Sequence, residues 1–140
     1  MALQERAATV DDVPAVLAFW ALAAEDAGRP ADDEALVEQL VARDPEALRL
    51  VLDREQIVGS LIAGWDGWRC HLYRLAVHPD HRRRGIGASL IVWAERRFAD
   101  LGGIRADAMV LGSNTMAHRA WTAAGYVPQA DWQRWVKPLT

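Results

Sequence analysis

The stretch that decides the fold is residues 72–90, which read LYRLAVHPDHRRRGIGASL. Its apolar beginning predicts the end of a strand over residues 68–77, because leucine, tyrosine and valine suit strands. A proline and two glycines then favour a turn, and apolar residues at helical spacing predict a helix over residues 88–101. A glycine turn at a helix N-terminus offers backbone N–H groups and positive dipole charge to an anion. The stretch therefore predicts a strand, a turn and a helix, with an anion site at the turn.

The chain on either side of this stretch supplies further helices and strands. Apolar spacing and capping residues predict helices over residues 11–25, 32–44 and 116–124. Runs rich in valine, leucine, isoleucine and aromatic residues predict strands over residues 48–53, 56–65, 105–111 and 133–136. We expect an antiparallel meander from residue 48 to residue 77, with Asp66-Gly67 as a two-residue type I′ hairpin turn. The strand, helix and strand from residue 68 to residue 111 imply a parallel pair.

The composition is typical of a globular protein. The chain has 140 residues, of which 51% are hydrophobic and 25% charged, and this predicts one domain over residues 1–140. No apolar stretch approaches the about 20 residues that span a bilayer, and residues 1–5 do not resemble a targeting signal. Cys70 is the single cysteine, so no intramolecular disulfide can form. We therefore expect a cytoplasmic protein with no membrane partner.

The net charge of −3 hides an asymmetry between the two halves of the chain. Residues 1–66 hold 14 acidic and 5 basic residues, whereas residues 67–140 hold 5 acidic and 11 basic residues. A basic half suits a phosphorylated ligand, and an acidic half suits a cationic one. Solvated faces of helices produce such counts as well, so the asymmetry favours these ligands without identifying them.

The turn at residues 82–87 has the residue types that hold a pyrophosphate. Arg82, Arg83 and Arg84 supply guanidinium donors beside the backbone N–H groups at Gly85 and Gly87. Two phosphate motifs are excluded, because a leucine stands where the dinucleotide fingerprint needs its third glycine and no Gly-Lys-Ser/Thr follows. The basic triplet is too short to predict a nucleic-acid partner. By itself, a lone Gly-x-Gly is equally typical of a plain turn.

Two segments carry a resemblance to a known family. Residues 72–90 resemble the core motif of GNAT superfamily N-acetyltransferases, which is a strand, a loop with proline, Arg/Gln-x-x-Gly-x-Gly/Ala and a helix. About thirty residues on, Asn114 to Tyr126 resembles the family's Asn-x-x-Ala, an aromatic residue and a terminal Gly-Phe/Tyr. The resemblance implies an α/β (α+β) fold. Its mixed sheet would have about six or seven strands and about four helices, with parallel fourth and fifth strands that splay apart.

The resemblance also implies where acetyl-CoA, the co-substrate, would bind. The pantetheine arm would enter the gap between the splayed strands and bond to the backbone of Leu75, Ala76 and Val77. The pyrophosphate would rest on the turn and on the start of the helix, namely on Arg82, Arg83, Arg84, Gly85, Ile86, Gly87 and Ala88. Asn114 would contact the CoA arm, although an asparagine at a helix start is equally suited to capping. No resident metal is expected, since the spacing of His78, His81 and His118 does not suit a metal site.

The implied reaction is direct attack of a neutral amine on the acetyl thioester through a tetrahedral intermediate. Aliphatic amines have a pKa of about 10, so a base or a water relay must remove a proton. His71 is the candidate base, because it stands where some protein-acetylating members carry a glutamate; a surface or structural role is the alternative. Alternation along the strand predicts that His71, Tyr73 and Leu75 share one face. Trp121 stands where many members carry a proton-donating tyrosine, so Tyr126, Tyr73 or solvent would protonate the departing thiolate.

The acceptor is indicated by charge and by aromatic residues. Residues 25–34 are acidic and, by resemblance, border the acceptor site, which favours a small primary amine as partner, although the acids of residues 32–34 are more typical of a helix start. Trp20, Trp65 and Trp68 would give the site aromatic walls, and core packing is the alternative role for most of the tryptophans. The alternatives are a protein N-terminal or lysine acetyltransferase, or a non-catalytic acyl-CoA-binding module. Homodimers are common in the family, so a homodimer is compatible with the resemblance.

Overall fold

The computed structural model describes residues 3–23, 32–112 and 114–140. The predicted end of the first helix and most of the acidic 25–34 segment lie outside the described residues. The strands are β1 (Leu3–Ala7), β2 (Leu48–Asp53), β3 (Gln56–Trp65), β4 (Cys70–Val77) and β5 (Ala106–Ala108). The helices are α1 (Val13–Ala23), α2 (Glu34–Arg43), α3 (Ile86–Leu101) and α4 (Thr115–Ala123), with short 3-10 turns η1 (Val10–Asp12) and η2 (Pro79–His81).

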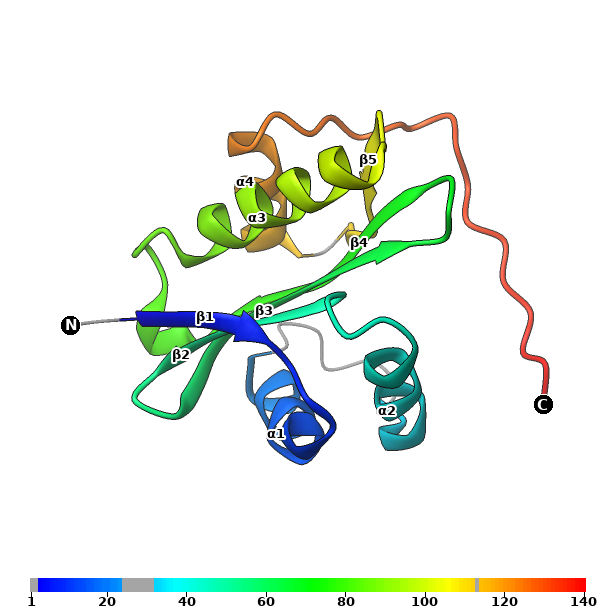
Figure 1. The fold of residues 1–140 in the computed structure, drawn as a ribbon. Helices are drawn as coiled ribbons and strands as arrows, with labels where there is room; N and C mark the ends of the chain where they lie inside the picture. The colour runs from blue at the N-terminus through cyan, green and yellow to red at the C-terminus, as the bar shows by residue number, and fades with distance from the viewer. Residues whose placement is uncertain (1–2, 24–31, 113) are drawn as a thin grey trace.

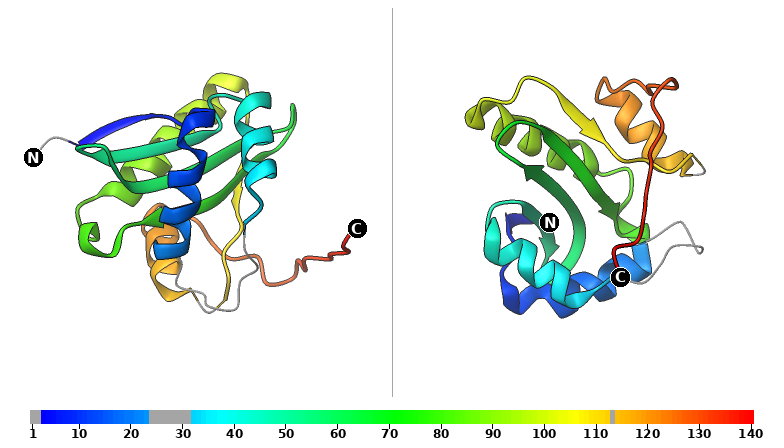
Figure 2. Two further views of the ribbon diagram at one scale, coloured as in Figure 1. Left: turned by 90° about the horizontal axis from the view of Figure 1, so that it is seen from below. Right: turned by 90° about the vertical axis from the view of Figure 1, so that its right-hand side faces the viewer.

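The five strands form one mixed sheet in the order β1-β2-β3-β4-β5. All neighbours pair antiparallel except β4 and β5, which are parallel. Helices α1 and α2 cover one face of the sheet, and α3 and α4 cover the other (Figures 1 and 2). The α/β class, the four helices and the parallel pair are therefore confirmed, whereas the expectation of six or seven strands is wrong for the described residues.

Each face of the sheet has its own hydrophobic core. The core under α1 and α2 contains Val16, Trp20 and Val41 packed against inward side chains of β2 and β3. The core under α3 and α4 contains Leu90 and Phe98. The buried residues of α3 follow the apolar spacing along that helix and are Ile86, Leu90, Ile91, Ala94 and Phe98. Because two helical layers enclose the sheet, β3 is buried along almost its whole length.

The predicted strand at residues 133–136 is absent. Trp132, Trp135 and Val136 are 71%, 88% and 74% exposed, and the segment runs along the outside of the molecule (Figure 1). Alternating residue types favour a strand only where a partner strand offers its backbone groups, and none of the described residues pairs with this segment. β5 is likewise shorter than the predicted 105–111. β1 lies in a range for which the residue pattern predicts no strand.

The turn between β3 and β4 also differs from its prediction. Trp65 pairs with Cys70, so four residues form the connection instead of two. Only Gly67 has a positive φ there, at 96°, whereas a type I′ turn needs positive φ at both central residues. The Asp66 carboxylate accepts hydrogen bonds from the N–H groups of Trp68 at 2.8 Å and Arg69 at 2.6 Å. This side-chain-to-backbone turn satisfies those N–H groups and replaces the tight hairpin.

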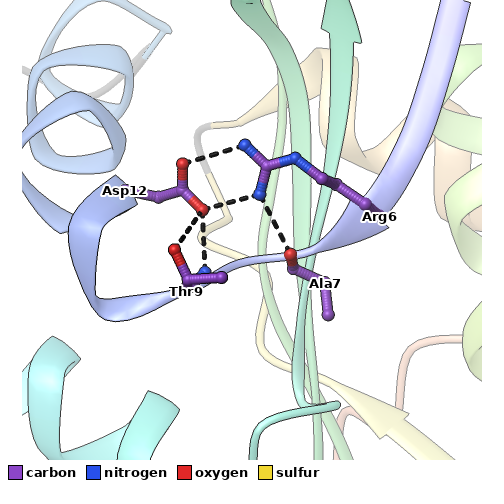
Figure 3. Close-up of polar contacts among 4 residues, drawn as sticks. All are labelled: Arg6, Ala7, Thr9 and Asp12. Atoms are coloured by element: carbon purple, nitrogen blue, oxygen red, sulfur yellow. Dashed lines mark hydrogen bonds and ion pairs between the residues drawn. The ribbon is translucent and has the colours of Figure 1, made fainter.

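An ion pair fixes the chain where β1 passes into α1 (Figure 3). The Arg6 guanidinium donates two hydrogen bonds to the Asp12 carboxylate, at 2.6 and 2.9 Å. Asp12 also accepts from the backbone N–H of Thr9 at 2.7 Å. The bond with Arg6, supported by Thr9, lowers the pKa of Asp12 from 3.8 to about 2.

We expect Asp12→Asn to remove an acid-dependent part of the stability. A carboxylate with a lowered folded-state pKa stabilises the fold above its unfolded pKa, 3.8, and loses that contribution as the pH falls toward about 2. The wild type should therefore lose about 1 kcal/mol more than the variant between pH 5 and pH 2, after allowance for solvent screening of the pair. Urea denaturation across that range measures the difference. Parallel pH profiles for the two proteins would contradict it.

Candidate active site

The parallel strands β4 and β5 pair only over the first three residues of β4. The paired residues are Cys70 with Ala106, His71 with Asp107, and Leu72 with Ala108. The last bond between the two segments runs from the Met109 N–H to the Leu72 carbonyl, at 3.1 Å. β4 continues to Val77, so its second half has no partner on this side among the described residues. The strands therefore separate, as the family resemblance implies.

A β-bulge interrupts β4 at the point where the two strands separate. Ser60 pairs with Ala76 and Ile62 with Tyr73, so two residues of β4, Arg74 and Leu75, lie opposite one residue of β3. Arg74 has a φ of 61°, in the left-handed region.

The bulge changes which side chains share a face of β4. Tyr73 and Ala76 pack against the core under α1 and α2, whereas Leu75 and Val77 pack against the core under α3. The prediction that His71, Tyr73 and Leu75 share a face is therefore wrong. His71 alternates with Leu72, so it lies on the face of Tyr73, and the extra residue moves Leu75 to the opposite face.

The backbone directions beyond the bulge determine which groups line the gap. The His78 N–H donates to the Val58 carbonyl at 2.8 Å, so antiparallel alternation directs the backbone groups of Ala76 toward β3 as well. The N–H and C=O groups of Leu75 and Val77 consequently face the gap toward β5. Of the three predicted pantetheine-binding residues, Leu75 and Val77 have backbone groups directed into the gap. The backbone groups of Ala76 instead face β3, within the sheet.

The glycine turn follows the open half of β4 after the short 3-10 turn η2. Gly85 has a φ of 78° and precedes α3, which begins at Ile86 instead of the predicted Ala88. The first N–H groups of a helix have no partner within the helix, so those of the first turn of α3 are available to an anion. A Cβ added to Gly87 would have only the Val77 side chain within 4 Å, at 3.9 Å, so the space beside this residue is open.

The three arginines of the turn are accessible to a ligand. None of the ion pairs within the described residues involves Arg82, Arg83 or Arg84. Arg83 and Arg84 are exposed and Arg82 is partly exposed. Three guanidinium groups that pair with none of the described carboxylates lie beside the N–H groups of the helix start, so this end of the gap is strongly favourable for a phosphorylated ligand.

The second motif, Asn114 to Tyr126, caps α4 and packs against the core under α3. The Asn114 side chain accepts a hydrogen bond from the Ala117 N–H at 3.0 Å, so it acts as the N-cap of α4. Trp121 is buried in the core under α3, and its ring lies 5.0 Å from that of Tyr126 in an edge-to-face arrangement. Tyr126 donates its hydroxyl hydrogen to Glu95 at 2.9 Å. Burial, together with Glu95, raises the pKa of Tyr126, so its phenol is protonated at neutral pH.

His71 lies between two carboxylates. Its Nδ1 is 2.9 Å from Asp107 on β5, and its Nε2 is 3.7 Å from Asp66 in the β3–β4 turn. The four-residue separation from Leu75 corresponds to roughly 13 Å along a strand. Asp107 therefore orients the imidazole, and water must carry a proton from the gap if His71 is to receive it.

The contact that supports the bulge was not foreseen from the sequence. The Trp20 indole N–H donates to the Ser60 hydroxyl at 2.8 Å, and that hydroxyl donates to the Arg74 carbonyl at 3.0 Å. Ser60 is fully buried on β3. The available signal was a lone serine within the otherwise apolar stretch of residues 57–63, because a buried hydroxyl requires partners.

Comparisons with known proteins agree with this geometry. Residues 15–126 match the family described as the acetyltransferase (GNAT) family. An acetyltransferase of Sodalis glossinidius is 34% identical over 105 residues, which cover 74% of this chain and 72% of the relative. One of Pectobacterium atrosepticum is 35% identical over 105 residues, covering 74% and 73%. This chain belongs to the GNAT family of acetyltransferases.

Solved structures share the fold at low sequence identity. The PaiA N-acetyltransferase of Thermoplasma acidophilum, solved in complex with coenzyme A, superposes with a TM-score of 0.82 at 14% identity, covering 92% of each chain. Ard1 of Thermoplasma volcanium superposes with a TM-score of 0.80 at 19% identity, covering 93% of this chain and 86% of the Ard1 chain. Within residues 3–23, 32–112 and 114–140, no helix is long and apolar enough to cross a membrane. The same ranges hold no cluster of three or more metal-ligating side chains.

Proposed function

We propose that this acetyltransferase moves the acetyl group of acetyl-CoA to a primary amine of a small molecule, with the reaction taking place in the gap between β4 and β5. The observation that carries this proposal is the separation of the two strands beyond Leu72, which frees backbone groups next to a glycine turn. A donor with a phosphorylated end and an amide-containing arm matches these two features. When bound there, acetyl-CoA supplies the activated acetyl thioester.

The chain's own residues fit this co-substrate along its length. The N–H groups of Ile86, Gly87 and Ala88 and the side chains of Arg82, Arg83 and Arg84 would hold the pyrophosphate. The backbone groups of Leu75 and Val77 would hold the pantetheine amides. Asn114 caps α4 beside the gap, and its contact with the CoA arm stays a proposal.

The Leu75 N–H is the proposed donor to the oxygen that becomes negative during acetyl transfer. It faces the gap, and an N–H held in place before the reaction stabilises developing charge without reorganisation. No covalent bond between the chain and the acetyl group is needed, because a neutral amine attacks the thioester directly.

His71 is the proposed base. Asp107 holds its Nδ1, which leaves Nε2 to accept a proton, and Asp66 lies 3.7 Å from Nε2 to stabilise the resulting cation. The path from the gap runs along the face of β4 that carries Tyr73. Water along that face would complete the relay.

Tyr126 is the proposed proton donor for the thiolate. Its raised pKa keeps the proton on the phenol, and its hydrogen bond to Glu95 holds the ring against the buried Trp121. A raised pKa also makes Tyr126 a weaker acid, so solvent can share this step. Trp121 itself packs in the core, where its indole supports Tyr126.

A small cationic amine is the acceptor that the local charge favours. Asp66 and Asp107 are both half-exposed beside His71. By contrast, Asp32 is paired with Arg74, so this carboxylate of the acidic segment is already neutralised. Within residues 3–23, 32–112 and 114–140, we assign the attraction for an ammonium group to Asp66 in the β3–β4 turn and Asp107 on β5.

A panel of acceptors tests this function. Free CoA release should rise above background with polyamines, amino acids or aminoglycosides, and not with peptides that offer an N-terminus or a lysine. Because the chain has a single cysteine and it is buried, a thiol reagent reports CoA with little background. Mass spectrometry should show one acetyl group added to the acceptor. Turnover with peptides alone would assign the chain to protein acetylation, and acetyl-CoA binding without any turnover would make it an acyl-CoA-binding module.

A further inference from the structure

We infer that Ser60 and Trp20 are positioning residues for acetyl transfer: they hold the bulge in β4 and thereby direct the Leu75 N–H into the gap. The inference rests on the proposed function for its catalytic consequence. The arrangement itself is a property of the chain without any ligand.

The chain of hydrogen bonds begins in α1 and ends on β4. Trp20 is 4% exposed and donates its indole N–H to the Ser60 hydroxyl at 2.8 Å. Ser60 is 0% exposed and donates its hydroxyl hydrogen to the Arg74 carbonyl at 3.0 Å. Trp20 thus orients the hydroxyl so that its single hydrogen is directed at the bulge.

The peptide plane connects this carbonyl to the reaction site. The Arg74 carbonyl and the Leu75 N–H belong to one trans peptide, so they point in opposite directions. Because Ser60 draws the carbonyl toward β3, the N–H must point away from β3 and into the gap. The hydroxyl of Ser60 therefore sets the direction of the N–H that would stabilise the oxyanion.

The same tryptophan also contacts the side chain of the bulged residue. The Arg74 guanidinium carbon lies 5.1 Å from the centre of the Trp20 ring, and the guanidinium pairs with Asp32. A non-glycine residue at a φ of 61° is strained, and such strain persists where surrounding contacts enforce it. Trp20 contacts the Arg74 side chain directly and the Arg74 carbonyl through the Ser60 hydroxyl, so the two residues together can enforce this conformation.

The test is Ser60→Ala, measured in three ways. The kcat for acetyl transfer should fall by at least about tenfold, because the oxyanion contact is made in the transition state. The Kd for acetyl-CoA, measured by calorimetry, should stay within about threefold, because the pyrophosphate end is untouched. In the ligand-free protein, the Ala76 amide should exchange hydrogen at least about tenfold faster, because its bond to β3 adjoins the bulge.

Two further variants separate positioning from packing. Trp20→Phe keeps an aromatic ring over Arg74 and removes the N–H donor to Ser60. Its kcat should therefore also fall, by a smaller factor than that of Ser60→Ala. Val58→Ala removes buried apolar contacts on β3, the strand that carries Ser60. At a loss of stability equal to that of Ser60→Ala, its kcat should still equal that of the wild type. An equal loss of kcat in Val58→Ala would overturn the inference, as would wild-type kcat and exchange in Ser60→Ala. A wild type that turns over no amine refutes the proposed function instead, and the exchange rates then decide whether Ser60 holds the bulge.

Discussion

Gly87→Glu is expected to raise the Kd for acetyl-CoA by at least about 100-fold, equivalent to about 3 kcal/mol. The residue lies in the first turn of α3, where the space beside it is open and the helix N–H groups have no partner within the helix. A glutamate side chain would fill that space and place negative charge where the pyrophosphate is proposed to rest. Calorimetric titration with acetyl-CoA measures the change.

Two control variants separate bulk and charge from damage to the fold. Gly87→Ala adds a Cβ whose single neighbour within 4 Å is Val77 at ordinary contact distance, so its Kd should stay within about threefold of the wild type. Ala99→Glu adds the same charge on the exposed face of α3 far from the turn and should bind normally. Wild-type affinity in Gly87→Glu would show that the pyrophosphate does not rest on this turn.

His71→Ala is expected to lower kcat by about 100-fold while the Kd for acetyl-CoA stays within about threefold, as loss of a general base commonly does. The imidazole is held by Asp107 on the side of the sheet that carries α1, away from the proposed pyrophosphate turn. Removing it should therefore impair proton removal from the amine and leave donor binding intact. Steady-state rates with the best acceptor of the panel, together with calorimetry, measure both quantities.

Chemical rescue distinguishes a base from a structural histidine. Added imidazole should restore part of the lost rate in His71→Ala, because a free base can occupy the vacated position. Asp107→Asn should lower kcat as His71→Ala does, because Asp107 orients the imidazole ring of His71. A variant without His71 that turns over at the wild-type rate would remove this residue from the mechanism.

The sequence contained enough local information to predict the central unit. The strand, glycine turn and helix of residues 72–90 depend on short-range signals: apolar runs, a proline and glycines that permit a positive φ. Gly85 indeed takes a φ of 78° at the start of α3, which begins two residues before its predicted start. The parallel pairing of β4 and β5 followed from the strand–helix–strand order, which permits few alternatives.

The bulge could not be predicted because it has no local signal. Arg74 takes a left-handed φ although arginine has no preference for it, and its conformation depends on Ser60 and Trp20, which are 14 and 54 residues earlier. The prediction for the face of Leu75 is wrong because the bulge adds one residue to β4. The predicted strand at residues 133–136 failed for a related reason, since alternation describes a strand and cannot supply its partner.

A crystal structure of the chain with acetyl-CoA tests the central claim most directly. We predict that the pantetheine arm lies between β4 and β5, with hydrogen bonds to the backbone of Leu75 and Val77, and that the pyrophosphate accepts from the N–H groups of Ile86 to Ala88. The thioester oxygen should lie within hydrogen-bond distance of the Leu75 N–H. A donor bound elsewhere on the chain, or one bonded to the β3-facing groups of Ala76, would contradict the account.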